Sequence, residues 1–221
     1  MTKPRVPETD HGIQGEFTVE IYDQFQCGMR DRGWIETQEI LKSGITQGQV
    51  LEVGPGPGYL GLEWLKHTQG TSLKGLEISP DMVALAGRNA QQYGFSDRAQ
   101  YVRSGGDRMP FDDNTFDAVF TNGSLHEWAE PRRLFAEIWR VLKPGGQVFI
   151  SDLRRDMPIF LKGFLWLNAK PPAIRPGLIT SINAAYTPAE LELLIHETRL
   201  AGCQVSANLI GLTLKGVKQI Q

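Results

Sequence analysis

Two short segments hold residues whose types and spacing could do chemistry. Residues 52–58 are Glu-Val-Gly-Pro-Gly-Pro-Gly, an acid followed by three glycines at alternate positions. Glycine tolerates a positive φ and lets a ligand approach the backbone, and a helix starting behind such a loop offers unpaired N–H groups to a carboxylate. Residues 122–128 are Asn-Gly-Ser-Leu-His-Glu-Trp, and a histidine such as His126 titrates near physiological pH. The first segment predicts a ligand-binding loop, and the second holds a group able to accept a proton.

Short apolar runs that alternate with longer amphipathic runs are expected to position both segments. Val50–Val53 precedes the glycine-rich loop and Tyr59–Lys66 follows it, which predicts a strand, a turn and a helix. Ligands of open parallel sheets bind at the carboxyl edge of the strands, where this loop would lie. The same alternation continues with strands at Leu73–Glu77, Gln100–Arg103, Phe116–Thr121 and Gln147–Asp152, helices at Ser79–Tyr93 and Pro131–Leu142, and a turn at Lys143–Gly146 that ends a helix and opens a strand.

The remaining segments flank this alternation. Phe17–Leu41 predicts one or two short helices, so we assign residues 1–48 to an N-terminal arm with cap helices and residues 49–221 to one α/β domain. Residues 153–186 break the alternation, and an excursion of that length is more often a functional cap than a plain connector. The C-terminal part predicts a capping box at Thr187–Glu190, a helix to about Leu200, and strands at Cys203–Leu209 and Leu212–Val217.

The glycine-rich loop has two alternative interpretations. Residues 56–61 also fit G-x-G-x-x-G, the dinucleotide fingerprint, which on its own is a weak match. A glycine turn that serves only chain reversal is the second alternative. Three alternate glycines after an apolar strand exceed what such a turn requires, which favours a ligand.

Four segments resemble the class I S-adenosylmethionine-dependent methyltransferases. Residues 52–58 match every defined position of the family's E/D-x-G-x-G-x-G motif, and residues 75–79 resemble its second strand. Residues 112–119 resemble its P-D-x-S-F-D-x-V segment, and residues 141–146 match its V-L-K-P-G-G turn. The resemblance is to methyltransferases of small molecules, including those of quinone and sterol synthesis. It implies a Rossmann-like α/β fold: a seven-stranded, mostly parallel sheet of order 3-2-1-4-5-7-6, with the last strand antiparallel and helices on both faces.

The resemblance also implies the cofactor and its contacts. The cofactor would be S-adenosyl-L-methionine and its product S-adenosyl-L-homocysteine. Glu77 would accept from both ribose hydroxyls, as a carboxylate is suited to do. Residues 106–111 are similar to the family's G-D-A-x-x-L-P-F segment but are two residues shorter. There, Asp107 would accept a hydrogen bond from the adenine amino group, and the Arg108 backbone N–H would donate to a ring nitrogen. The expected cofactor-binding residues are Glu52, Gly54, Gly56, Gly58, Tyr59, Glu77, Ile78, Met82, Asp107, Arg108 and Asn122.

The binding site for the molecule that accepts the methyl group is expected to be built around His126 and Glu127. Relatives carry S-x-x-L-H-H after the fourth strand, so both residues are base candidates, and Glu127 replaces the family's second histidine. A hydrogen-bonded structural histidine and a surface glutamate are the alternatives. The resemblance also places substrate-binding residues in an N-terminal helix and in a lid-like insertion at 153–186, for which core packing or a dimer contact are alternatives. These residues are Tyr22, Phe25, Arg30, Phe160, Phe164 and Trp166.

Composition excludes several function classes. The formal charge is −2 without a basic run, and no N/D-P-P-aromatic segment follows the fourth strand, so we expect a small-molecule acceptor and no nucleic acid. Cys27 and Cys203 form no cysteine-pair motif, and the other histidines lack ligand-spaced partners, so no metal is expected. Neither a signal peptide nor a membrane span is indicated, and we expect a cytoplasmic monomer or homodimer. A non-catalytic S-adenosylmethionine-binding module and, less strongly, an NAD-dependent enzyme are the alternatives.

Overall fold

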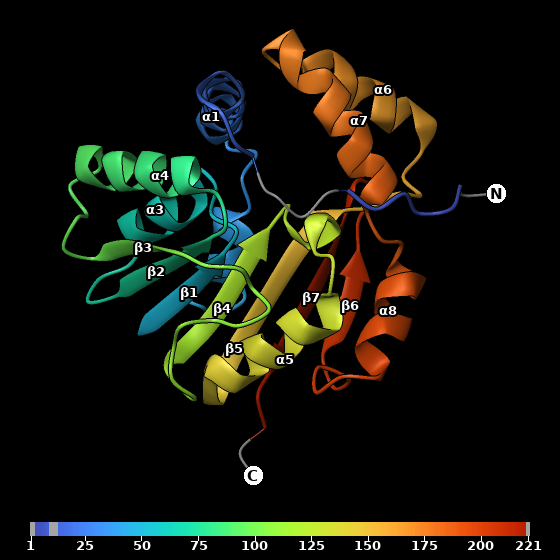
Figure 1. Cartoon of the computed structure of the whole chain (residues 1–221). Coiled ribbons are helices and arrows are strands. Elements are labelled where there is room, and N and C mark those ends of the chain that lie inside the picture. The colour runs from blue at the N-terminus through green and yellow to red at the C-terminus, as the bar shows by residue number, and fades with distance from the viewer. Residues whose placement is uncertain (1–2, 9–12, 220–221) are drawn as a thin grey trace.

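The computed structural model describes residues 3–8 and 13–219, which form one seven-stranded sheet with helices on both faces (Figure 1). The strand order is β3-β2-β1-β4-β5-β7-β6. The strands β1 to β5 pair in parallel, while β7 runs antiparallel to both β5 and β6. The predicted strand order and the antiparallel last strand are therefore confirmed. The strands are β1 (Gln49–Val53), β2 (Ser72–Glu77), β3 (Ala99–Arg103), β4 (Phe116–Asn122), β5 (Leu142–Leu153), β6 (Gln204–Ala207) and β7 (Gly211–Val217).

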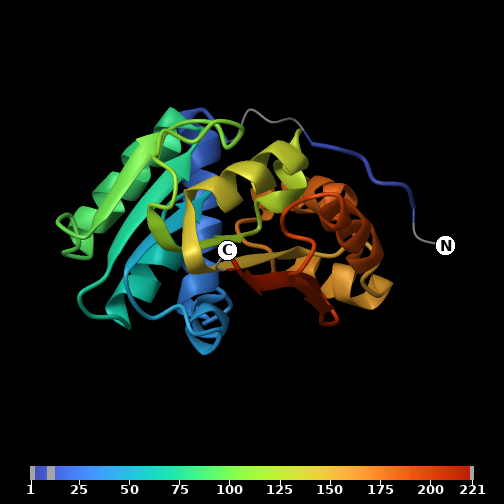
Figure 2. The same cartoon turned by 90° about the horizontal axis from the view of Figure 1, so that it is seen from below.

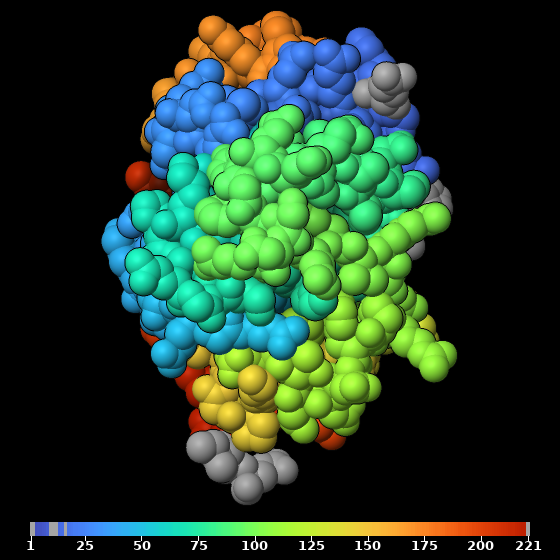
Figure 3. All heavy atoms as spheres, turned by 90° about the vertical axis from the view of Figure 1, so that its left-hand side faces the viewer, coloured from blue at the N-terminus to red at the C-terminus, as the bar shows by residue number. Residues whose placement is uncertain are grey.

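Alternate side chains of the central strands enter two separate cores. In β5, Val148 and Ile150 pack in one cluster and Phe149 packs in the other, as the two-residue period of a strand requires. The first core includes α5 (Pro131–Val141) and α8 (Pro188–His196), and the second includes α2 (Thr37–Lys42), α3 (Tyr59–Lys66) and α4 (Pro80–Gln92). Figure 2 shows these helices from below, and Figure 3 shows the outer side of α4.

Local sequence signals set several helix ends. Ser79 caps α4 by accepting a hydrogen bond from the Met82 N–H at 3.2 Å, with Pro80 at the first helical position. Thr187 and Glu190 form the predicted capping box at the start of α8. That helix ends at His196, before the predicted Leu200.

The Lys143–Gly146 segment differs from its prediction. It was expected to be a turn between helix and strand, but α5 ends at Val141 and β5 begins at Leu142, so the segment lies within the strand. Gly145 N–H donates to the Lys218 carbonyl at 2.7 Å, and Lys218 N–H donates to the Gly146 carbonyl at 2.8 Å. Pairing with residues far along the chain extends the strand through the turn sequence, which local composition does not indicate.

Three helical segments lie beyond the carboxyl ends of the central strands (Figure 1). They are α1 (Glu16–Asp31) and, from residues 153–186, α6 (Ile159–Asn168) and α7 (Arg175–Ala184), the last two joined by the short helix η2 (Pro172–Ile174). The short helix η1 (Leu125–Glu127) follows β4 at the same end. Within the described residues, no helix combines the length and apolar character needed to cross a bilayer.

Candidate active site

The glycine-rich loop joins β1 to α3 and is tied to the end of β2. Gly54, Gly56 and Gly58 all have positive φ, at 65°, 53° and 83°, which glycine adopts without strain. The Glu77 carboxylate accepts hydrogen bonds from the backbone N–H groups of Gly56 and Ser79, each at 3.0 Å. Burial raises the pKa of Glu77 although these N–H donors lower it. The buried carboxylate thus fixes the loop, and its oxygens retain lone pairs for a ligand.

A cavity of about 290 Å³ opens beside this loop, with apolar and acidic walls. Apolar side chains from β2 and α4 form one wall, and Glu77 and Asp107 supply carboxylates. These hydrogen-bond acceptors and apolar surfaces fit a ligand with hydroxyl groups and a flat apolar ring. The lining includes Ile13, Tyr22, Gly54, Gly56, Leu76, Glu77, Ile78, Met82, Ser104, Asp107, Gly123, Glu127 and Trp128.

A larger cavity of about 840 Å³ lies between the sheet edge and the helices α1, α6, η2 and α7. Four residues line both cavities, so the two meet at Ile13, Tyr22, Gly123 and Glu127. The walls of the larger cavity are mainly apolar, which suits a partly apolar small molecule. They include Phe17, Ile21, Phe25, Met29, Trp34, Leu165, Ile174 and Leu178, with Glu8, Asn122, His126 and Asp152 as polar members.

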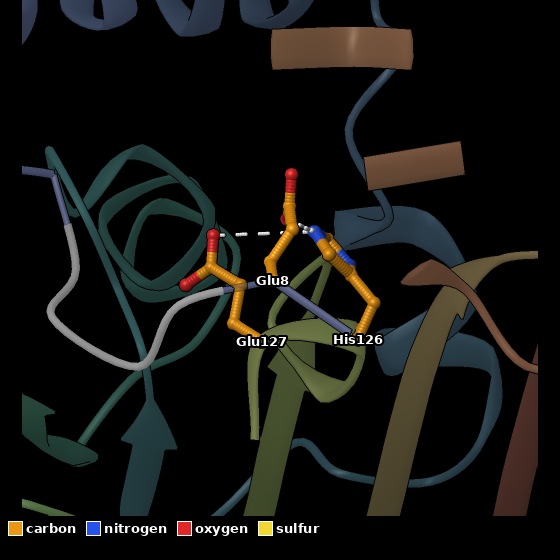
Figure 4. A group of neighbouring side chains, drawn as sticks. All are labelled: Glu8, His126 and Glu127. Carbon is orange, nitrogen blue, oxygen red and sulfur yellow. Dashed lines mark ion pairs between the residues drawn. The ribbon is translucent and has the colours of Figure 1, made fainter. Parts of the chain in front are cut away.

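His126 lies at the inner end of this larger cavity and is held by Asp152. The imidazole Nδ1 is 2.9 Å from Asp152 Oδ1, and the His126 backbone N–H donates to Asp152 Oδ2 at 2.8 Å. On the other side, Nε2 lies 3.4 Å from Glu8 Oε2 and 3.9 Å from Glu127 Oε1, as Figure 4 shows. Only 5% of the His126 side chain is exposed. Three carboxyl groups therefore surround one buried imidazole.

These neighbours shift the pKa of both base candidates. Burial lowers the pKa of His126, but the charge and hydrogen bond of Asp152, followed by Glu8 and Glu127, outweigh it and raise the pKa to about 10. Burial raises the pKa of Glu127 to about 7, against the lowering effect of His126. In this arrangement the imidazole holds its proton at neutral pH, which differs from the expectation of a histidine that titrates there.

Comparison with known proteins supplies the family. Residues 51–150 match the family described as "Methyltransferase domain", and the relatives of the chain include sterol and quinone methyltransferases. Residues 51–150 form a class I S-adenosylmethionine-dependent methyltransferase domain. The predicted family is confirmed, and S-adenosyl-L-methionine is the cofactor that membership implies.

Two relatives each match less than half of this chain. The chain is 40% identical over 104 residues to a sterol 24-C-methyltransferase of Gibberella zeae, covering 47% of this chain and 27% of that protein. It is 36% identical over 92 residues to a demethylmenaquinone methyltransferase of Clavibacter sepedonicus, covering 41% of this chain and 37% of that protein. The chain thus spans less than half the length of these two relatives. A crystal structure of a putative S-adenosyl-L-methionine-dependent methyltransferase from Methanococcus maripaludis has the same fold, with a TM-score of 0.71 at 22% identity, covering 100% of this chain and 98% of that one.

The methyltransferase fold brings six of the expected cofactor residues to the smaller cavity. They are Gly54, Gly56, Glu77, Ile78, Met82 and Asp107. The other expected residues lie outside its lining. Tyr59 donates its hydroxyl to Asp23 at 2.9 Å, Asn122 donates to the Ser151 hydroxyl at 2.8 Å and lines the larger cavity, and Arg108 is exposed. Gly58 shapes the loop, since a Cβ there would lie 2.6 Å from the Tyr101 hydroxyl.

Glu52, the acid of the family's first motif, is buried beneath the loop and does not line the smaller cavity. It is 2% exposed, and its Oε2 has no hydrogen-bond partner among the described residues. Burial raises its pKa to about 8, against a backbone hydrogen bond from Gly61. Glu52 is therefore a protonated carboxylic acid at neutral pH.

Replacing Glu52 with glutamine is expected to flatten the pH dependence of stability. The folded chain holds the Glu52 proton up to about pH 8, whereas the unfolded chain releases it near the ordinary value of 4.5. Stability from this group is thus full below pH 4.5 and is lost as the pH rises towards 8. Glutamine does not titrate, so Glu52→Gln lacks this loss. Between pH 5 and pH 8, the free energy of unfolding of the wild type should therefore fall by at least ~1 kcal/mol more than that of Glu52→Gln. Urea unfolding at both pH values measures this, and parallel pH curves would contradict it.

The residues expected to bind the methyl acceptor divide into two groups. Tyr22 and Phe25 line the larger cavity. Arg30 does not: it bonds Asp31 and Tyr93 and lies over the Tyr59 ring at 4.6 Å. The structure also places Phe160, Phe164 and Trp166 outside the lining, at 69%, 47% and 40% exposure. Leu165 and Asn168 are the α6 residues that line the cavity.

Two residues of the His126 cluster did not figure in the sequence predictions. Asp152 is the penultimate residue of β5, next to the end of β4, so its place at the carboxyl edge of neighbouring parallel strands could have marked it as a site residue. Glu8 belongs to the N-terminal arm, where no periodicity or motif points to the site. The expectation of no metal rested on spacing along the chain, which does not reveal that Glu8, His126 and Glu127 converge.

Proposed function

We propose that the chain transfers the methyl group of S-adenosylmethionine to a small, partly apolar acceptor held in the larger cavity. The observation that carries this proposal is that the two cavities meet at Tyr22, Gly123 and Glu127. An in-line displacement needs the acceptor atom directly opposite the departing sulfur, which two adjoining cavities provide. The sterol and quinone acceptors named for the relatives are likewise small and at least partly apolar.

The cofactor supplies a methyl group already activated on a sulfonium, so the protein has three tasks. It holds the donor by Glu77 and the glycine-rich loop, and it aligns an O, N, S or C nucleophile against the methyl carbon. It also shields both from water by apolar walls. As the acceptor bonds the methyl carbon, the carbon–sulfur bond breaks and the acceptor's proton passes to the Glu127 carboxylate or to solvent, giving S-adenosylhomocysteine.

His126 and Glu127 are the polar groups we place at the reacting centre. Glu127 borders both cavities, and His126 faces the larger one beside it. The arm of residues 1–48 and the insertion at 153–186 are proposed to act as the cap and lid of the domain at 49–221. Contacts between these parts support this: Arg5 donates to the Ala184 carbonyl at 2.5 Å and to the His126 carbonyl at 2.8 Å.

Calorimetry and a methylation screen test the proposal. S-adenosylhomocysteine should bind while NADH does not, and a labelled methyl donor should modify at least one compound in a panel of phenols, quinols, thiols and amines. Tight NADH binding alone would overturn the proposal. Cofactor binding without any methylated product in an untargeted extract screen would favour the non-catalytic binding module instead.

Filling the larger cavity is expected to reduce turnover without affecting the cofactor. Leu178 of α7 lines this cavity, so Leu178→Trp adds volume where the acceptor would lie. With an acceptor from the panel, we expect kcat/KM to fall at least about tenfold, which corresponds to ~1.4 kcal/mol of lost transition-state stabilisation. S-adenosylhomocysteine affinity should stay within about twofold.

Leu193→Trp is the matched control, because Leu193 lies 73% exposed on α8 and outside the cavity lining. Steady-state kinetics and calorimetry on both variants separate the two sites. Equal turnover in the two variants would place the acceptor elsewhere.

A further inference from the structure

We propose that Glu8, His126 and Glu127 form a binding site for a divalent first-row transition metal ion where the two cavities meet. Glu8 comes from the N-terminal arm and the other two from η1, so folding of the arm completes the site. One atom from each residue, His126 Nε2 and a carboxylate oxygen from each glutamate, lies within 4.8 Å of the other two. Figure 4 shows the three side chains converging.

The spacing within the cluster suits a shared ion better than direct hydrogen bonds. His126 Nε2 is 3.4 Å from Glu8 Oε2 and 3.9 Å from Glu127 Oε1. A hydrogen bond between an imidazolium and a carboxylate is about 2.7–2.9 Å long. Ligands that bind a tetrahedral Zn²⁺ at about 2.0–2.1 Å lie roughly 3.3–3.4 Å from one another. The separation of Nε2 from Glu8 Oε2 therefore matches that of two ligands of one ion, and Glu127 Oε1 would have to move about 0.5 Å closer to Nε2 to match it as well.

The imidazole nitrogen that faces the cluster has ion-pair neighbours but no hydrogen-bond partner among the described residues, and a bound ion would replace the proton that it carries at neutral pH. His126 Nε2 is buried and makes no hydrogen bond to any described residue. A buried polar atom without a partner is costly, and it commonly marks the place of a water molecule or an ion. The other ring nitrogen, Nδ1, is held by Asp152 at 2.9 Å. That carboxylate–imidazole pair is the arrangement that orients histidine ligands in metal sites.

The charges around the cluster favour a cation. Glu8, Glu127 and Asp152 place three carboxyl groups around one imidazole. The described residues that line the larger cavity include neither lysine nor arginine. The nearest arginine contact is that of Arg5, whose guanidinium binds the main-chain carbonyls of His126 and Ala184 rather than the carboxylates.

The ligand set indicates the class of ion. One imidazole with two carboxylates suits Zn²⁺, Mn²⁺ or Fe²⁺, whereas Mg²⁺ and Ca²⁺ prefer sites built from oxygen ligands alone. Three protein ligands leave at least one coordination position open, as in catalytic metal sites. The larger cavity offers space for that position.

The role of the ion rests on the proposed function. Glu127 lines both cavities, so an ion beside it would lie next to the methyl acceptor. Bound to an acceptor hydroxyl or thiol, the ion would lower the pKa of that group and fix its direction towards the methyl carbon. The inferred acceptors are therefore molecules that present a metal-binding oxygen or sulfur.

Zinc titration of the untagged and chelator-treated chain of residues 1–221 tests the site. By calorimetry we expect one Zn²⁺ per chain, with Mg²⁺ binding at least about 100-fold more weakly. Glu8→Gln and Glu127→Gln should each weaken Zn²⁺ binding at least tenfold, and His126→Ala should abolish it. Asp152→Asn, which acts through His126, should cost about 10–100-fold. Co²⁺ gives a second readout, a visible absorption band that Zn²⁺ displaces.

Two exposed substitutions serve as controls, Glu192→Gln and His196→Asn on α8. Neither should change Zn²⁺ affinity, and S-adenosylhomocysteine binding reports that each variant is folded. Glu8→Gln keeps the test valid if His126→Ala does not fold, because Glu8 lies on the arm with a 20% exposed side chain.

The outcomes separate this inference from the proposed function. No Zn²⁺ binding, or binding that is unchanged in Glu8→Gln and Glu127→Gln, would overturn the metal site. Methylation by the metal-free chain would then leave the proposed function intact. Zn²⁺ binding in a chain that binds no S-adenosylhomocysteine would instead support the site and overturn the proposed function.

Discussion

Replacing Glu77 with alanine is expected to weaken S-adenosylhomocysteine binding at least 100-fold. The carboxylate is 7% exposed and accepts from the N–H groups of Gly56 and Ser79. As the proposed acceptor for both ribose hydroxyls, it would make two hydrogen bonds to a charged group, worth about 1.5–3 kcal/mol each. Since a factor of 100 is ~2.7 kcal/mol, losing both bonds exceeds that threshold. The glycine-rich loop also loses its tie to β2.

Calorimetry on Glu77→Ala, Glu77→Gln and the exposed Glu192→Ala gives the measurement and its control. Glutamine keeps the shape but replaces one acceptor oxygen with a donor, so its effect should lie between the other two. If Glu77→Ala binds S-adenosylhomocysteine within threefold of the wild type while its melting temperature falls, Glu77 braces the loop and does not contact the cofactor.

Replacing glycine with alanine at two helical positions, Gly61 and Gly87, is expected to change the free energy of unfolding in opposite directions. A Cβ at Gly61 in α3 would lie 2.3 Å from Glu52 Oε2 and 2.4 Å from Leu73 Cδ2, whereas a Cβ at Gly87 in α4 meets no atom within 4 Å. Overpacking a core costs about 1–3 kcal/mol, while glycine to alanine at an open helical site stabilises by roughly 0.5–1 kcal/mol.

Gly61→Ala should therefore lower the free energy of unfolding by about 1–3 kcal/mol, and Gly87→Ala should raise it by about 0.5–1 kcal/mol. Urea unfolding of the free protein at one pH measures both. Equal values for the two variants would mean that α3 moves away from β1 and β2 at little cost. The buried Glu52 carboxyl would then be less tightly confined than its contacts indicate.

The fold was predictable where local pattern and long-range packing agree. The apolar runs of β1, β2, β4 and β5 alternate with amphipathic helices, and the resemblance supplied the strand order, which is confirmed. Boundaries differ where distant pairing decides them. Residues 143–146 look like a turn, yet they join β5 because Lys218 pairs with Gly145 and Gly146.

The candidate site was predictable in the same uneven way. Residues at strand ends, such as Gly56 after β1 and Glu77 at the end of β2, line the smaller cavity because parallel strands present their carboxyl ends at one edge. In α6, the family resemblance suggested that Phe160, Phe164 and Trp166 face a ligand. An apolar stripe does not state which side of a helix meets the cavity, and the structure turns Leu165 inward.

The sequence by itself determined the glycine-rich loop and the acid beside it, which are proposed to bind the methyl donor. A glycine-rich loop directly after a strand and an acid at the end of the next strand are neighbours through local geometry, so their order along the chain is sufficient. Only the tertiary structure decided the acceptor side. Glu8, His126 and Asp152 meet because side-chain contacts such as those of Arg5 with Ala184 and His126 hold the arm against α7 and η1. Such contacts join distant segments without any periodic pattern, so the sequence carries no local sign of them.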